Sequence, residues 1–238
     1  MKPDQNISVV IPVYNEADVI ESVIRGFYEQ VIRKMANASL IIAEDGSTDG
    51  TKEILARLQN ELGFILISGV ERKGYTRAFK DALAVAKTPW VFFSDSDGQH
   101  DPADVFKMIE NADGVDIVSG FKNPRRDPAH RLILSAVYNF LIGLIFGLHL
   151  KDIDSGFKLI RQEVIVNVLP RVIKMEYCVM SEFLLRAYLM GYKIKEVPVT
   201  HYPRKSGTTA IFHPKKLPGI VGGLLRALWE IRAEYQKK

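Results

Sequence analysis

Short apolar runs alternate with helical patterns through the first half of the chain. The apolar runs predict strands over residues 7–11, 39–43, 64–67, 90–93 and 116–118. The segments between them predict helices over residues 17–31, 51–62, 75–86 and 102–110. Strands that alternate with helices of this size are typical of a mainly parallel sheet with helices on both faces. We therefore expect an α/β fold.

The second half of the chain differs in composition, because residues 132–148 are strongly apolar and carry no formal charge. A helix of that length would be about 25 Å long, at the lower edge of a membrane span. Ser135 and Asn139 interrupt the segment, and Arg131 and Lys151 flank it. These features favour a buried or membrane-surface helix, with a transmembrane helix as the alternative. The remaining predicted elements are an apolar segment over 164–170, a helix over 182–190, a strand over 192–199 and a basic amphipathic helix over 217–235.

The composition fits a globular unit with a sizeable core, since 47% of the 238 residues are hydrophobic and 25% are charged. The formal net charge of +4 is too mild to indicate a bulk nucleic-acid binder. Cys178 is the only cysteine, which excludes an internal disulfide and favours a reducing compartment. We expect no signal peptide, because the first residues are polar and the apolar run after them is short.

Three polar loops follow predicted strands, at residues 12–16, 44–50 and 94–100. In open α/β sheets the carboxyl ends of the strands form the ligand site, so we expect these loops to converge. Asp95 and Asp97, two positions apart, can bind one Mg²⁺ or Mn²⁺ ion, and such ions usually also hold substrate phosphates. The alternative for this pair is a solvated turn or a helix cap.

The other two loops can contact a nucleotide. Residues 12–16 would present backbone N–H groups at a helix start and side chains for a base or ribose, or form a turn with Asn15 as N-cap. Asp45 could accept hydrogen bonds from a base, or its loop could cap the next helix. Gly74 would let a phosphate or base edge approach the backbone closely.

Basic residues gather in two clusters that could bind phosphates. One cluster consists of Lys122, Arg125, Arg126 and Arg131, and the other of Arg204, Lys205, Lys215 and Lys216.

The order and spacing of these motifs resemble glycosyltransferase family two, across roughly residues 7–213. Within this family the chain looks like the polyprenyl-phosphate sugar synthases, of the dolichyl-phosphate mannose synthase type. The early motifs are Pro12-x-Tyr14-Asn15-Glu16, Glu44-Asp45-Gly46-Ser47-x-Asp49-Gly50-Thr51 and Asp95-x-Asp97-x-Gln99-His100. The later ones are Gly120-Phe121-Lys122, Asp152-x-x-Ser155-Gly156-Phe157-Lys158, Glu182, Glu196-Val197-Pro198-Val199 and Arg204-x-x-Gly207-x-Thr209.

The resemblance implies an A-type glycosyltransferase fold, which is Rossmann-like, and a nucleotide-sugar donor of the GDP-mannose or UDP-glucose type. Residues 1–213 would form the catalytic domain, and residues 214–238 a basic helix in the same unit. With the loop residues above, the expected donor contacts are Pro12, Tyr14, Asn15, Glu16, Asp45, Gly74, Asp95, Ser96, Asp97, Lys122 and Arg204. The expected ligands of Mg²⁺ or Mn²⁺ are Asp95, Asp97 and Gln99. The expected contacts of an acceptor phosphate are Lys122, Arg125, Arg131, Arg204 and Lys205.

Two positions depart from the family pattern. Glu44 stands where the family usually has the first of two aspartates, while Asp45 keeps the second. Ala210 stands where a lysine is common, so one phosphate contact would have to come from Lys205 or from a lysine at 215 or 216.

The expected chemistry is displacement of a nucleoside diphosphate, with inversion at the sugar. A phosphate monoester is already ionised and nucleophilic near neutral pH, so the reaction needs positive charge more than a strong base. The candidate catalytic residues are Asp97, Asp152, Glu182 and Arg131. For Asp152 and Glu182 the alternatives are a helix cap or an ion pair with Lys158 or Arg186. His100 is expected to be structural, and His201 stays open as a ligand.

The resemblance, together with this chemistry, implies transfer of a hexose to a polyprenyl phosphate, dolichyl or undecaprenyl. The alternatives are a family-two transferase with a saccharide acceptor and a non-catalytic subunit that binds nucleotide sugars. A lipid acceptor would also explain residues 132–148 and the basic stretch 215–238, which could dock on an anionic membrane. We expect peripheral attachment at the cytoplasmic face, or a separate membrane partner, and no nucleic-acid ligand.

Overall fold

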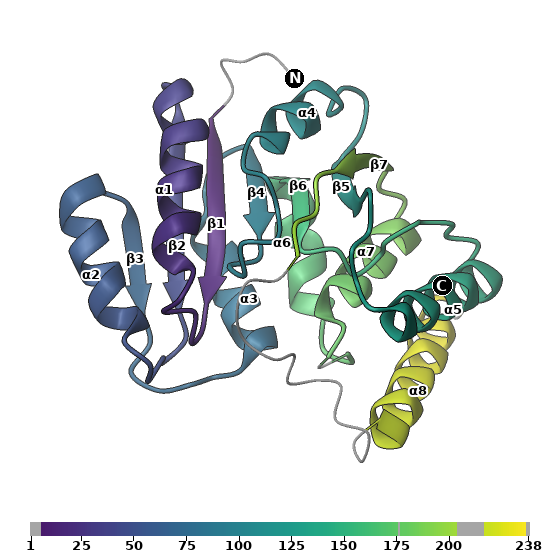
Figure 1. Cartoon of the computed structure of the whole chain (residues 1–238). Helices are drawn as coiled ribbons and strands as arrows, with labels where there is room; N and C mark the ends of the chain where they lie inside the picture. Colours follow the sequence, from purple (N-terminus) through teal and green to yellow (C-terminus); the bar gives the residue numbers. More distant parts are fainter. Residues whose placement is uncertain (1–5, 176, 204–216, 237–238) are drawn as a thin grey trace.

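The computed structural model describes residues 6–175, 177–203 and 217–236. A seven-stranded sheet forms its centre, in the order β3-β2-β1-β4-β6-β5-β7 (Figure 1). The strands are β1 (Ile7–Val13), β2 (Ala38–Glu44), β3 (Ile65–Ser68), β4 (Trp90–Ser94), β5 (Ile117–Lys122), β6 (Phe157–Arg161) and β7 (Ile194–Val199). Only β6 runs antiparallel to its neighbours within this sheet. The prediction of a mainly parallel sheet is therefore confirmed.

Helices cover both faces of the sheet. The α-helices are α1 (Ile20–Gln30), α2 (Thr51–Leu62), α3 (Tyr75–Val85), α4 (Asp104–Glu110), α5 (Ala129–Phe146), α6 (Gln162–Val168), α7 (Val179–Leu189) and α8 (Leu217–Gln236). Short 3₁₀ turns occur at η1 (Ile32–Lys34) and η2 (Leu169–Arg171). One apolar cluster packs α1, α2 and α4 against one face, and a second packs α3, α6 and α7, with residues of α5 and α8, against the other.

The central strands are buried on both faces, as expected for parallel strands under two helical layers. In β1, Val9 and Ile11 belong to one apolar cluster and Val10 to the other. This two-sided burial explains why the strand reads as a continuous apolar run rather than as an alternating one.

The chain order reverses at β1, which pairs with β2 on one side and with β4 on the other. The loops after these three strands therefore meet at one edge of the sheet, which is the usual ligand position of such folds. The loop after β5 and the segment after β7 lie beside them, because β5 and β7 run in the same direction as each other and β6 returns between β4 and β5.

Candidate active site

The loops after β1 and β2 are joined by hydrogen bonds. The Asn15 N–H donates to Ser47 Oγ at 2.9 Å, and the Thr48 N–H donates to Asn15 Oδ1 at 2.9 Å. Asn15 adopts a positive φ of 51°. It is not an N-cap, because α1 begins five residues later and has Val19 at that position. The alternative interpretation of Asn15 is therefore wrong, and its side chain instead holds the two loops together.

Asp45 connects the loop after β2 to the start of α3. Its buried carboxylate accepts hydrogen bonds from the backbone N–H groups of Lys73 (2.8 Å) and Gly74 (3.0 Å). The structure thus brings together two predicted donor contacts, Asp45 and Gly74. The N-cap of α2 is Gly50, and Asp49 Oδ1 accepts from the Thr51 N–H, at the first residue of the helix, at 3.1 Å.

Tyr14 lies next to an arginine that the sequence analysis missed. The guanidinium of Arg72 sits 4.1 Å from the centre of the Tyr14 ring, a cation–π distance. The only sequence signal for Arg72 is its place directly before Lys73 and Gly74. Of the other predicted donor residues in these loops, Pro12 is buried in β1, and the Glu16 N–H donates to Thr51 Oγ1 at 3.0 Å.

The Asp95 carboxylate is held from two sides. Its Oδ1 accepts a hydrogen bond from the Tyr75 hydroxyl at 3.0 Å. On the other side it lies against Gly156, where a Cβ atom would come within 1.8 Å of Asp95 Oδ2. The Asp95 N–H also donates to the Gly156 carbonyl at 3.0 Å. The glycine of the Ser155-Gly156-Phe157 motif therefore leaves the space that this carboxylate fills.

Burial, and then the nearby Asp97 carboxylate, raise the pKa of Asp95 to about 6. The Asp97 carboxylate thus disfavours ionisation of Asp95, and a cation bound beside them would offset this repulsion. Asp97 Oδ1 also accepts from the Gln99 N–H at 3.2 Å, and Ser96 is buried between the two aspartates. The structure thus brings together the residues predicted to bind metal.

This donor set fits Mg²⁺ or Mn²⁺ shared with a diphosphate. Within the described residues, no three His, Cys, Asp or Glu side chains form a closed metal cage. Mg²⁺ is usually bound by one or two carboxylates together with substrate phosphates and water, so such a cage is not needed. The Gln99 side-chain nitrogen donates to the Tyr202 carbonyl at 3.1 Å, and the amide oxygen is the atom that a cation would take.

Two buried histidines tie the segment after β7 to the carboxylate loop. His100 and His201 form an isolated β-bridge, and their ring centres are 6.1 Å apart. His100 stacks on Phe157 at 4.7 Å, and burial, assisted by the charge of Lys122, lowers its pKa to about 3. Burial likewise lowers the pKa of His201. Both rings are therefore neutral near pH 7.

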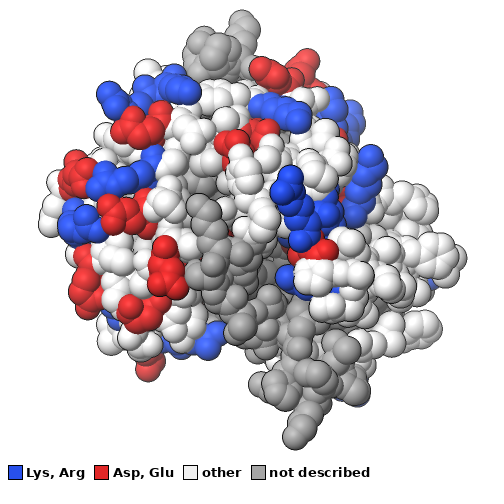
Figure 2. Space-filling model, in the orientation of Figure 1, with Lys and Arg blue, Asp and Glu red and all other residues white. Residues whose placement is uncertain are grey.

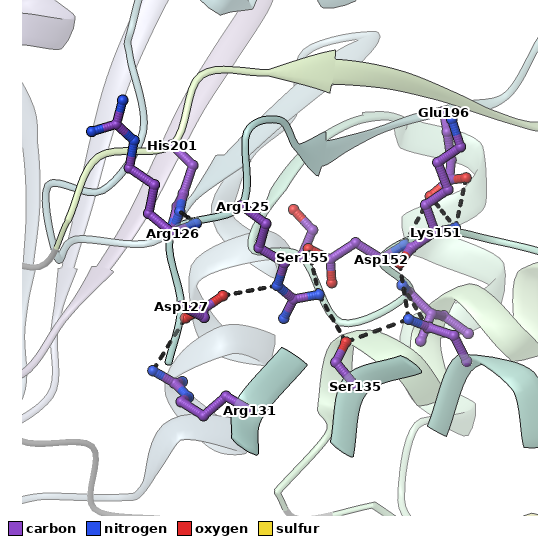
Figure 3. Close-up of polar contacts among 12 residues, drawn as sticks. Arg125, Arg126, Asp127, Arg131, Ser135, Lys151, Asp152, Ser155, Glu196 and His201 are labelled. Atoms are coloured by element: carbon purple, nitrogen blue, oxygen red, sulfur yellow. Dashed lines mark hydrogen bonds and ion pairs between the residues drawn. The ribbon is translucent and has the colours of Figure 1, made fainter. Parts of the chain in front are cut away.

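A second group of predicted residues lies at the start of α5. Figure 3 shows Asp127 between Arg125 and Arg131. Asp127 Oδ2 accepts from Arg125 Nε at 2.8 Å, and Asp127 Oδ1 lies 3.3 Å from Arg131 Nη1. Arg125 Nη1 also donates to Ser135 Oγ on α5 at 2.8 Å. Asp127 was not predicted, although its position inside a basic cluster was the available signal.

Lys122 stands between the two groups. It is partly exposed at the end of β5, and its charge opposes the rise in the pKa of Asp95. Burial would raise the pKa of Asp127, but the Arg125 hydrogen bond and the charges of Lys122, Arg125 and Arg131 lower it overall. The carboxylate loop and the arginine cluster therefore share one electrostatic environment.

Asp152 adjoins the arginine cluster. Its Oδ2 lies 3.9 Å from Arg125 Nη1, is buried, and has no hydrogen-bond partner among the described residues (Figure 3). The backbone N–H groups of Lys151 and Asp152 donate to Glu196, which fixes this loop against β7. Lys158, the alternative partner of Asp152, is fully buried, and its Nζ donates to the Ser155 carbonyl.

Glu182 is placed differently from the other predicted catalytic residues. It is fully buried, and its oxygens accept from the N–H groups of residues 173–175 at 2.7–3.0 Å and from Arg186 Nε at 2.7 Å. The structure therefore shows the ion pair with Arg186 that was the alternative, and none of these contacts is to the carboxylate loop. Arg204, Lys205, Ala210, Lys215 and Lys216 lie outside the described residues.

Residues 8–169 match the model of the family described as Glycosyl transferase family 2. The chain belongs to this family. The protein is thus a glycosyltransferase with the A-type fold, which confirms the predicted family, fold and enzyme class.

Similar proteins cover most of the chain. The polyprenol monophosphomannose synthase of Mycolicibacterium smegmatis is 27% identical over 225 residues, which span 88% of this chain and 82% of that protein. Glycosyltransferase AglJ of Haloferax volcanii is 26% identical over 221 residues, 90% of this chain and 69% of that one. The crystal structure of glucosyl-3-phosphoglycerate synthase from Mycobacterium tuberculosis, in complex with Mn²⁺, UDP and phosphoglyceric acid, has a TM-score of 0.72. It is 22% identical and matches 94% of this chain and 78% of that chain, which demonstrates a shared fold.

Proposed function

We propose that this glycosyltransferase transfers a hexose, with inversion, from a nucleoside diphosphate sugar to a polyprenyl phosphate. The observation that carries this proposal is that Arg125 and Arg131 both bind Asp127. This group lies at the start of α5, a helix whose outer face is apolar. An anion bound by these two arginines would lie next to an apolar surface that could contact a hydrocarbon chain. A lipid phosphate has that combination of a charged head and an apolar chain.

The donor half of the proposal rests on the carboxylate loop. Asp95, Asp97 and Gln99 would hold Mg²⁺ or Mn²⁺ together with the donor diphosphate, as the Mn²⁺ and UDP in the M. tuberculosis structure also suggest. When bound, the metal would supply positive charge to the leaving diphosphate. The hydrogen-bonded loops after β1 and β2 would receive the nucleoside, and Lys122 would face the phosphates.

The acceptor half rests on Arg125 and Arg131, which Asp127 keeps in fixed orientations. Their side chains are 25% and 30% exposed, so they are partly desolvated but accessible. The first N–H groups of α5 and its positive dipole end add to the attraction for an anion. Asp152, with its unpartnered Oδ2 beside Arg125, is placed to orient the attacking phosphate oxygen or a sugar hydroxyl. The polyprenol monophosphomannose synthase relative supports this choice of acceptor.

The membrane half rests on α5 and α8. Large apolar side chains project from both helices, with Phe140 at 68%, Leu144 at 71% and Trp229 at 75% exposure. Figure 2 shows an uncharged surface over α5, with Lys and Arg side chains next to it. Such a surface beside basic residues is typical of a protein that docks on anionic lipid.

By length and composition, α5 alone among the described helices passes as a candidate membrane span, yet its inner side is bound to the protein. The Asn139 side chain donates to the Lys151 carbonyl at 2.9 Å, and Arg232 of α8 donates to the Ile145 carbonyl at 2.9 Å. Ile142 is buried in the core. These contacts favour a helix that lies on a membrane surface rather than across it. We take that surface to be the cytoplasmic face, with or without a membrane-bound partner subunit.

The decisive experiment gives purified protein GDP-mannose or UDP-glucose with a radiolabelled sugar, Mn²⁺ or Mg²⁺, and vesicles with or without a polyprenyl phosphate. We expect label in the organic extract with one donor, only when lipid phosphate and metal are present. Phosphoglyceric acid and free saccharides serve as competing acceptors. Label that stays in the aqueous phase with every donor would refute the lipid acceptor.

Variants test the acceptor site separately from the donor site. Arg131→Ala should raise the KM for lipid phosphate about tenfold or more, because a charge-assisted contact is lost, while the KM for the donor changes little. Arg33→Ala is the matched control, since Arg33 pairs with Glu29 at the same i,i+4 spacing on an exposed surface. Equal kinetics for Arg131→Ala and wild type would remove Arg131 from the acceptor site.

A further inference from the structure

Tyr75 makes a contact that no motif of the sequence predicts. It is the first residue of α3 and is 44% exposed, yet its hydroxyl reaches the carboxylate loop and donates to Asp95 Oδ1 at 3.0 Å. The opposite side of that carboxylate lies against Gly156, where no side-chain atom fits. The Asp95 carboxylate is therefore confined between a hydroxyl donor and a backbone wall.

The position of Tyr75 is set by Asp45 and Gly74, two of the residues predicted to contact the nucleotide sugar. Asp45 binds the two preceding N–H groups, those of Lys73 and Gly74, at 2.8 and 3.0 Å. Gly74 has a positive φ of 92°, and its carbonyl accepts the N–H groups of residues 77 and 78 in the first turn of α3. Phe79, one turn further along, is fully buried and packs edge-on against Phe93 of β4 at 5.2 Å. The first turn of α3 is therefore fixed by contacts before and after Tyr75. These contacts place Tyr75 next to the end of β4.

We infer that Tyr75 is a positioning residue for the metal site, which holds Asp95 in its ligating orientation and connects it through α3 to Asp45. The inference rests on the proposed function, because it takes Asp95 to be a metal ligand. A carboxylate oxygen that accepts one hydroxyl proton keeps another lone pair for a cation. A ligand that is already oriented loses less rotational freedom when the metal binds. Hydrogen bonds to metal ligands of this kind typically change metal affinity by about 10–100-fold.

The test compares Mn²⁺ binding by wild type and Tyr75→Phe, which keeps the ring and removes only the hydroxyl. Free Mn²⁺ is measured by electron paramagnetic resonance, without nucleotide and with GDP or UDP. We expect the Kd for Mn²⁺ to rise about tenfold in the variant. The Mn²⁺ concentration for half-maximal transfer should rise in parallel, while kcat at saturating Mn²⁺ recovers. A general structural defect would lower kcat at every metal concentration.

Tyr188→Phe is the matched control, because it removes an exposed tyrosine hydroxyl that donates to the Gly147 carbonyl at 3.3 Å, away from the site. Unchanged or tighter Mn²⁺ binding by Tyr75→Phe would overturn the inference. If wild type bound no Mn²⁺ under any condition, the inference would fail together with the metal part of the proposed function. If wild type bound Mn²⁺ but transferred no sugar to lipid, only the proposed function would fail.

Discussion

At the scale of single residues, the missing side chain of Gly156 decides whether the Asp95 carboxylate fits. A Cβ at this position would lie 1.8 Å from Asp95 Oδ2, so the carboxylate would have to move. We expect Gly156→Ala to weaken Mn²⁺ binding and transfer by at least about tenfold. Calorimetric titration with Mn²⁺ measures the binding. Gly222→Ala is the control, because nothing lies within 4 Å of that position and its Mn²⁺ affinity should match that of wild type.

His100 gives a prediction about acid stability. Its pKa is lowered to about 3 in the folded protein, against 6.5 for an ordinary histidine. Between these values the unfolded chain binds a proton that the folded chain does not, so His100 makes stability fall as the pH drops below about 6.5. The slope is at most about 1.4 kcal/mol per pH unit. Asp95 acts in the opposite sense, because its raised pKa favours protonation of the folded state.

The difference between wild type and His100→Phe isolates the histidine contribution. Urea unfolding at pH 7.5, 6.5, 5.5 and 4.5 should give a free energy of unfolding that falls less steeply in the variant below pH 6.5. Parallel curves for the two proteins would contradict the neutral, buried state of His100.

Residues whose side-chain type itself indicates a chemical role were predictable from the sequence. Residues that support them through tertiary contacts were not. Asp95 and Asp97 were predicted because the pair follows a strand, lies with two other polar loops at one sheet edge and matches a family motif, and the structure places the two residues together. Tyr75 and Arg72 act through partners far away in the sequence, because Tyr75 contacts Asp95, 20 positions away, and Arg72 contacts the ring of Tyr14. Such contacts depend on how α3 and the loop before it meet the sheet, which local patterns do not specify. Asp127 differs, because its partners Arg125 and Arg131 are close in the sequence.

At the scale of elements, the Glu182–Arg186 pair secures α7 and the segment before it. Its Nε–Oε1 distance of 2.7 Å and its i,i+4 spacing are shared by the Glu29–Arg33 pair, whose shortest N–O distance is also 2.7 Å. The side chains of the first pair are 0% and 3% exposed, and those of the second 54% and 62%. The two pairs thus share distance and spacing but differ in burial, and Glu182 also accepts three backbone N–H groups.

This match gives a test of the role of Glu182. We expect Glu182→Ala to lower the free energy of unfolding by about 3–5 kcal/mol, because Arg186 and three N–H groups lose a buried partner. Glu29→Ala should cost at most about 0.5 kcal/mol. Denaturant unfolding measures both. A variant Glu182→Ala that kept its stability but lost kcat would instead restore the catalytic interpretation.

The elements themselves were largely predictable, because most strands are continuous apolar runs and most helices are amphipathic. The clear omission is β6, whose five residues include Lys158 and Arg161. A fully buried lysine breaks the apolar pattern that identifies a central strand. The predicted start of the first helix was also wrong, since α1 begins at Ile20 rather than at residue 17. The residues before it belong to the loop after β1, which is hydrogen-bonded to the loop after β2.

At the scale of the whole molecule, the carboxylate loop and the arginine cluster lie on either side of Lys122, and the apolar face of α5 continues outward from the arginines. A donor with a soluble nucleoside and an acceptor with an insoluble chain could then approach from different directions. Only the acceptor phosphate and the sugar diphosphate of the donor would need to meet inside the protein, where a phosphate oxygen would displace the nucleoside diphosphate from the sugar. If the acceptor is a lipid phosphate, as proposed above, the α5 face has to contact the membrane.

That requirement leads to a prediction about membrane binding. Phe140→Asp combined with Leu144→Asp should raise the Kd for anionic vesicles at least about tenfold, because burying each side chain is worth about 1.5–3 kcal/mol. Co-sedimentation with vesicles measures the binding. Val166→Asp is the control, since Val166 is a 61% exposed apolar residue on α6. Transfer to a short, water-soluble polyprenyl phosphate should stay near the wild-type rate in all three proteins, because the arginine cluster is unchanged. Equal vesicle binding by the α5 variant and the control would show that another surface meets the membrane, and the lipid would then have to reach Arg125 and Arg131 by another route.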